Sequence, residues 1–81
     1  MFGEPAELDA GRQRIAALLR ENDLDGALAA FREVFIKTDY SPDCWQVFDE
    51  MGSHFADAEA RADYDAMRAK LEALAAGPLA P

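Results

Sequence analysis

The only Cys, the only Trp and the only His of this 81-residue chain lie in one short stretch, TDYSPDCWQVFDEMGSHF. Cys44 could serve as a nucleophile, Trp45 as an anchor in a protein interface, and His54 as a base or a metal ligand. Six acidic residues and no Lys or Arg lie between residues 38 and 60. The stretch is therefore a candidate for a reactive site, for a partner-binding face, or for the interior of a helical domain.

Cys44 is expected near the start of a helix, where the helix dipole can lower the pKa of a thiol. The carboxylates of Asp43 and Asp39 lie close in sequence and oppose formation of a thiolate. Cys44 also falls on an apolar stripe with Phe48 and Met51. We therefore predict a buried structural cysteine.

Catalytic and metal sites have little support elsewhere in the chain. His54 and Glu50 are four residues apart with Asp57 nearby, but a metal site would need further ligands. There is no Gly-rich loop, no nucleophile elbow, and no base paired by spacing with Ser41 or Ser53. The sequence predicts no enzyme, no metal site and no cofactor.

The elements that must position these residues are helices. No apolar run alternates with a period of two, whereas spacings of three and four residues recur in four segments. The signals that bound them include Asp23, the Ser41-Pro42-Asp43 start, and the Gly77-Pro78 stop. The sequence predicts one all-α domain over residues 6–76, with tails at 1–5 and 77–81. Its helices are expected at about 6–21, 24–37, from the Ser-Pro-Asp start to about 55, and from after Asp57 to 76.

The last two helices cannot form one straight rod. The stripe through Phe48 and Phe55 and the stripe through Tyr64 and Leu71 are out of phase by two residues, which rotates one face by about 200° relative to the other. We predict a turn between His54 and Asp57. The fold class that follows is four short helices arranged as two antiparallel helical hairpins.

Charge and length restrict the partners. Sixteen acidic against eight basic residues give a net charge of −8, which repels nucleic acid and anionic membranes and favours a basic protein partner. Glu4 and Glu7 lie where a secretory signal would need basic residues, and one Cys forms no disulfide framework, so we expect a cytoplasmic protein. A chain this short has a small core, so a homodimer is a further possibility.

The acidic stretch favours a partner-binding face on the third helix. Trp45 is expected at the edge of the apolar stripe, with Gly52 two turns later on the same side. This pattern indicates either close packing of one helix against Gly52, or a shallow groove in which Trp45, ringed by carboxylates, anchors a basic helix or peptide. In the second interpretation the partner-binding residues are Tyr40, Asp43, Trp45, Gln46, Asp49 and Glu50.

Two segments resemble a known family. The segment ENDLDGALAAFREVF resembles the turn and second helix of a tetratricopeptide repeat, with Ala27 and Phe31 at its small and aromatic positions. The segment SPDCWQVFDEMG looks like the proline-started first helix of a following repeat, with Trp45 near its usual place. The resemblance covers about half the chain. It implies a protein-binding module built of helical hairpins.

Three functions follow in order of support. The first is an adaptor or accessory subunit that binds a basic protein through the third helix. The second is an acidic inhibitor or immunity-type protein, whose carboxylates replace phosphates on a basic nucleic-acid-binding surface. The third is a carrier protein, since VFDEMGSHF resembles the segment before the prosthetic-group serine, although Phe55 then occupies the serine position.

Overall fold

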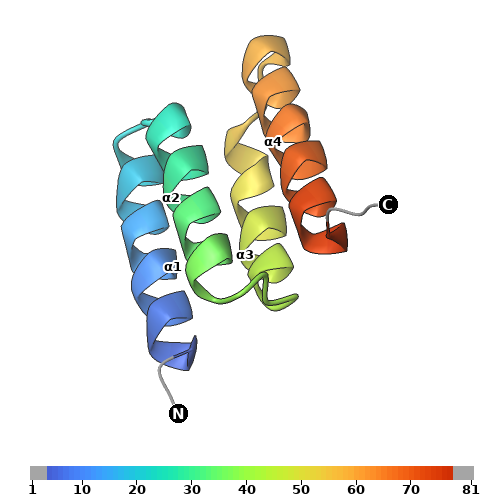
Figure 1. Cartoon of the computed structure of the whole chain (residues 1–81). Coiled ribbons are helices and arrows are strands. Elements are labelled where there is room, and N and C mark those ends of the chain that lie inside the picture. The colour runs from blue at the N-terminus through green and yellow to red at the C-terminus, as the bar shows by residue number, and fades with distance from the viewer. Residues whose placement is uncertain (1–3, 78–81) are drawn as a thin grey trace.

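A computed structural model describes residues 4–77 of the chain. It contains α1 (Glu4–Arg20), α2 (Leu24–Lys37), α3 (Cys44–Met51), a 3-10 turn η1 (Gly52–His54) and α4 (Ala58–Ala76), and no strand within the described range (Figure 1). The all-α prediction is confirmed. The predicted tails at 1–3 and 78–81 lie outside the described residues, while residues 4 and 5 already belong to α1. No helix in residues 4–77 combines the length and hydropathy needed to cross a bilayer.

Side-chain caps fix the starts of two helices. The Asp23 carboxylate accepts a hydrogen bond of 3.0 Å from the Gly26 amide, and Asp57 accepts one of 3.1 Å from Ala60. Asn22 has a left-handed backbone with φ of 61°, which ends α1 as the sequence indicates. The short turns at these positions reverse the chain between α1 and α2 and before α4.

The start of α3 differs from the prediction. The helix begins at Cys44, because Ser41 and Pro42 form a turn in which the buried Ser41 hydroxyl accepts a 3.3 Å hydrogen bond from Asp43 N. Two consecutive left-handed residues, Asp39 and Tyr40, with φ of 58° and 62°, precede this turn. The turn ends α2 and redirects the chain into α3.

The four helices form two layers. Backbone contacts join α1 to α3 and α2 to α4, and α2 also contacts α1 and α3. The Cα envelope measures 35 × 32 × 16 Å. Its shortest dimension corresponds to two helices packed one on the other. In Figure 1, successive helices run in opposite directions, so α2 and α4 are parallel to each other. The molecule therefore has two broad faces, one formed by α1 and α3 and the other by α2 and α4.

The first hairpin is held by close approach of α1 and α2. A Cβ atom built on Gly11 would overlap Val34 Cγ2, so the two helices can approach closely at that point because Gly11 has no side chain. Ile15, Phe31 and Phe35 are almost fully buried beside this contact. Gly11 is therefore a packing point between α1 and α2.

The second hairpin is held by aromatic rings. The rings of Phe48 on α3 and Tyr64 on α4 stack with centroids 4.2 Å apart, and the Tyr64 hydroxyl donates a 2.6 Å hydrogen bond to the Phe48 carbonyl. One helix packs closely against Gly52, as the first interpretation expects, and the contact is Tyr64 of α4, since a Cβ on Gly52 would lie 2.7 Å from Tyr64 Oη. The predicted turn between His54 and Asp57 is confirmed. Leu74, placed on the apolar stripe by its spacing, is 38% exposed.

Candidate partner-binding surfaces

Cys44 is part of the core. Its side chain is fully buried and its Sγ lies 3.2 Å from the Thr38 hydroxyl, which also lies 2.9 Å from the Val34 carbonyl oxygen and donates to it. The predicted burial is confirmed. Between residues 4 and 77 no three His, Cys, Asp or Glu side chains gather in a way that could hold a metal ion.

Trp45 is half-buried and lies against the core. Its ring centroid is 5.0 Å from that of Phe35 and 5.6 Å from that of Phe48, and the Arg68 guanidinium lies 5.5 Å above the ring. Tyr40 is 37% exposed and packs 5.4 Å from Phe35. Most of the indole therefore contributes to packing, and Arg68 covers part of the remainder.

The acidic residues of α3 are already paired within the molecule. Asp49 Oδ1 accepts a hydrogen bond of 3.3 Å from Arg68 on α4, and Glu50 Oε1 accepts one of 2.8 Å from Arg12 on α1. The two carboxylates thus tie α3 to neighbours on opposite sides. Their charge is partly neutralised, which reduces their ability to attract a basic partner.

The predicted residues on α3 meet two different neighbouring helices. Trp45 and Asp49, four residues apart, lie on the side of α3 that meets Arg68 of α4. Gln46 and Glu50, also four apart, lie on the side that meets α1. Tyr40, Asp43, Gln46, Asp49 and Glu50 are exposed, but a carboxylate ring around Trp45 is not what the fold builds.

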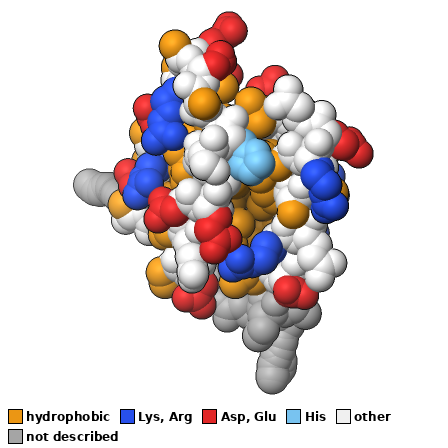
Figure 2. Space-filling model, turned by 180° about the vertical axis from the view of Figure 1, so that it is seen from behind, with side chains coloured by type: hydrophobic (Ala, Val, Ile, Leu, Met, Phe, Trp, Pro, Cys, Tyr) orange, Lys and Arg blue, Asp and Glu red, His pale blue; other side chains and the backbone are white. Residues whose placement is uncertain are grey.

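A groove between α1 and α3 is the feature that the sequence did not reveal. It has a volume of about 200 Å³, and Figure 2 shows it as a hollow with an apolar floor on the back of the molecule, beside the pale blue His54. Arg12, Glu50 and His54 provide the polar part of its lining. The apolar part comes from two pairs of residues spaced by four, together with one exposed alanine: Ile15, Leu19, Val47, Met51 and Ala16.

A second surface gathers negative charge where α2 and α4 begin. A hollow of about 400 Å³ at that end has five carboxylates and no Lys or Arg in its lining. Two of the carboxylates cap the helices, as described above. The five residues are Asp23, Asp25, Asp57, Glu59 and Asp63. We call this surface the acidic end.

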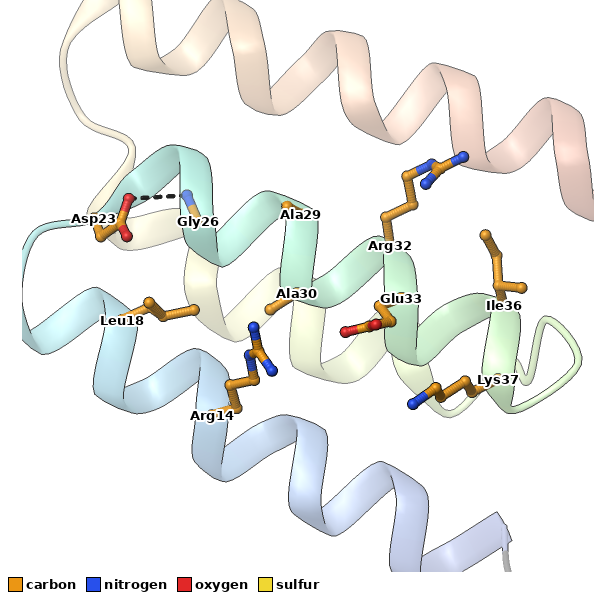
Figure 3. Close-up of a pocket in the computed structure, with 10 residues that line it drawn as sticks. All are labelled: Arg14, Leu18, Asp23, Gly26, Ala29, Ala30, Arg32, Glu33, Ile36 and Lys37. Carbon is orange, nitrogen blue, oxygen red and sulfur yellow. Dashed lines mark hydrogen bonds between the residues drawn. The ribbon is translucent and has the colours of Figure 1, made fainter.

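A hollow of about 520 Å³ follows α2 and carries charges of both signs (Figure 3). In Figure 3, Arg14, Glu33 and Lys37 lie between α1 and α2, whereas Arg32 and Ile36 point from α2 toward α4. Opposite charges lie side by side on the α1 side of α2. This arrangement indicates a solvated surface and no single class of ligand.

Tyr64 is a buried titratable group on α4 whose hydroxyl bonds the backbone of α3. Burial raises the pKa of its phenol above the ordinary 10.0, and the negative charge of Asp49 acts in the same direction, while Arg61 and Arg68 oppose the shift. The phenol is therefore neutral at physiological pH and acts as the hydrogen-bond donor between α3 and α4. Its role in the hairpin is structural.

Comparison with protein-family models, with curated proteins and with solved structures gives no match to this chain.

Proposed function

We propose that this chain is a cytoplasmic protein-interaction module that binds a partner protein with a basic surface. The observation that carries the proposal is the groove between α1 and α3 on one broad face, which opens to solvent at Ala16 and the half-buried Leu19 above a floor of buried apolar residues. A groove of this kind accommodates apolar side chains of a helix or an extended segment. The resemblance to tetratricopeptide repeats favours the same class of function.

The polar groups around the groove define the partner. Glu50 lies at its rim beside Gln46, and the overall charge of −8 attracts basic proteins over distances of about a Debye length. A cationic side chain of the partner can compete with Arg12 for the Glu50 carboxylate, because that ion pair is about half exposed. The expected ligand is an amphipathic segment with apolar residues and nearby Lys or Arg.

The proposal is tested by filling the groove. Ala16 is exposed and lines the groove, so Ala16→Phe would occupy it without disturbing the core. Tagged wild-type chain and the variant are used to capture proteins from a cell lysate, and the bound proteins are quantified by mass spectrometry. We expect Ala16→Phe to reduce recovery of the specific partner by about tenfold or more, as loss of a central interface contact does.

Ala62→Phe is the matched control, since Ala62 is an exposed alanine on α4 that lines none of the hollows described above. The control should retain the partner. The complexes captured by wild type and by Ala62→Phe should both dissociate as the salt concentration is raised. Equal recovery by wild type, Ala16→Phe and Ala62→Phe would show that the partner does not bind in the groove.

A second candidate function has support from the acidic end. Five carboxylates without a neighbouring cation in their lining can occupy sites that phosphates occupy on a nucleic-acid-binding protein. An inhibitor of this kind would lose its target when Asp25, Glu59 and Asp63 are changed to Asn or Gln, and would keep it with Ala16→Phe. The opposite pattern supports the interaction module.

A further inference from the structure

Two of the exposed large apolar side chains lie on the broad face formed by α2 and α4. Ile36 on α2 is 42% exposed and Leu74 on α4 is 38% exposed. Each lies on the same side of its helix as an exposed cation, because Ile36 comes four residues after Arg32 and Leu74 comes four residues after Lys70. This face therefore exposes apolar surface at the ends where both helices finish.

Between the two helices lies a hollow of about 410 Å³. Small residues line its middle, namely Ala29 on α2 and Ala66 on α4, with Leu28 and Met67 beneath them. The small side chains leave room for another element to approach closely.

Charge is distributed along this face in an ordered way. Asp25 precedes Arg32 by seven residues on α2, and Asp63 precedes Lys70 by seven residues on α4. Because α2 and α4 are parallel, both carboxylates lie at one end of the hollow and both cations at the other. The midpoints of the two pairs fall beside Ala29 and Ala66.

None of these four charges forms an ion pair within residues 4–77. The arginines that do pair within the molecule, such as Arg12 and Arg68, tie α3 to its neighbours. The charges on the α2–α4 face are thus available to a partner.

We propose that the α2–α4 face binds a second copy of this chain, related by a two-fold axis that runs across the helices. That rotation reverses the helix direction, so it places the small residues at the middle of one copy against those of the other. It brings Asp25 opposite Arg32 of the second copy and Asp63 opposite Lys70 of the second copy, each pair occurring twice. A two-fold axis parallel to the helices would instead place carboxylates against carboxylates.

The dimer leaves the groove between α1 and α3 free, because the two lie on opposite broad faces. The dimer is independent of binding through the groove, and either can fail alone, whereas the dimer would cover Asp25 and Asp63 of the acidic end. A face formed by two helices is small by the standards of permanent dimers, so we expect a weak, concentration-dependent association.

Sedimentation equilibrium from about 10 µM to about 1 mM, in about 0.1 M salt, provides the test. The wild-type weight-average mass should rise from 8.9 kDa toward twice that value. Arg32→Glu/Lys70→Glu makes both ends of the face acidic, and Asp25→Lys/Asp63→Lys makes both ends basic. Each double variant alone should remain monomeric, whereas an equimolar mixture of the two should form a heterodimer.

Arg14→Glu/Lys37→Glu is the control for net charge. It changes the charge by the same amount as Arg32→Glu/Lys70→Glu, but at side chains that lie between α1 and α2. The control should dimerise, and circular dichroism should show all variants folded. A wild type that stays monomeric to about 1 mM, a mixture that stays monomeric, or a control that loses the dimer would each overturn the proposal.

Discussion

The two hairpins solve the same packing problem in different ways. In the first hairpin, α1 and α2 approach until Gly11 is covered by Val34, and the contact is aliphatic. In the second, the Phe48 and Tyr64 rings lie between α3 and α4, and a hydrogen bond of 2.6 Å from Tyr64 fixes their spacing. The first depends on the absence of a side chain, and the second depends on the presence of two large ones.

The difference affects how each hairpin tolerates change. The first has no buried polar group at its closest contact, so its stability should follow the volume of a few side chains. The second combines ring stacking with a hydrogen bond that the Tyr64 phenol can donate only while it is protonated. Its stability should therefore also depend on pH. Four predictions test this comparison.

The largest effect is expected for Phe48→Ala. Phe48 is fully buried and its ring contacts those of Phe31, Trp45 and Tyr64. Removing it should lower the free energy of unfolding by about 3–5 kcal/mol, measured by urea denaturation at pH 7. Val34→Ala, in the first hairpin, should cost less because it removes two methyl groups. Equal losses of unfolding free energy in Phe48→Ala and Val34→Ala would contradict the claim that ring packing holds the second hairpin.

Gly11→Ala should cost up to about 2 kcal/mol. The added methyl group overlaps Val34, which costs about 1–3 kcal/mol, while the better helix propensity of Ala returns about 1 kcal/mol. In a Val34→Ala background the overlap with Cγ2 is removed and the 3.0 Å approach to the Cβ of residue 34 remains, so the same change should cost less. A double-mutant cycle by urea denaturation measures the difference, and a Gly11→Ala cost that is the same in both backgrounds would show that α1 and α2 do not meet here.

Tyr64→Phe should cost about 1 kcal/mol at pH 7, the usual value of a buried hydrogen bond. Because burial raises the pKa of the Tyr64 phenol, the unfolded chain releases this proton first as the pH rises. The stability from the neutral phenol is complete below its unfolded pKa of 10.0 and is lost as the pH passes through the raised folded value. Urea denaturation at pH 8 to 11 should show that Tyr64→Phe loses less stability than wild type as the pH rises. If the unfolding free energies of the two proteins fall in parallel with pH, the phenol is not buried as described.

The smallest effects are expected at the arginines that flank α3. Arg12→Ala removes an exposed ion pair to Glu50 and should change stability by less than about 1 kcal/mol. Arg68→Ala also uncovers the Trp45 ring, so it should cost somewhat more and shift Trp45 fluorescence to longer wavelength. An unchanged spectrum would mean that Arg68 does not cover the indole.

The helices and their order could be predicted from local patterns. The phase change between the Phe48 and Tyr64 stripes was enough to place the turn after η1, and Asp57 caps α4 as its position suggests. The start of α3 could not be predicted in this way. The Ser41 hydroxyl accepts a hydrogen bond from the Asp43 amide within a turn, instead of capping a helix that begins at Pro42. Local rules describe a helix well where its end is exposed and poorly where the end is packed against the core.

The candidate site was harder to predict because it depends on distant pairs. Arg12 and Glu50 are 38 residues apart, and Arg68 and Asp49 are 19 apart, so no local pattern shows that these carboxylates are paired. The α1–α3 groove likewise needs Ile15 of one hairpin beside the other hairpin. The burial of Cys44 was predictable from its place on the apolar stripe, but the assembly of residues into surfaces required the fold.

The binding groove between α1 and α3 is the central claim, and a titration followed by nuclear magnetic resonance tests it most directly. The ¹⁵N-labelled chain is mixed with an amphipathic helical peptide of Leu and Lys residues, which has the chemistry proposed for the partner. We predict that the amide shifts concentrate around Ile15, Ala16, Leu19, Val47 and Met51 and disappear in Ala16→Phe. Shifts confined to the acidic end, or no shifts at all, would contradict the account.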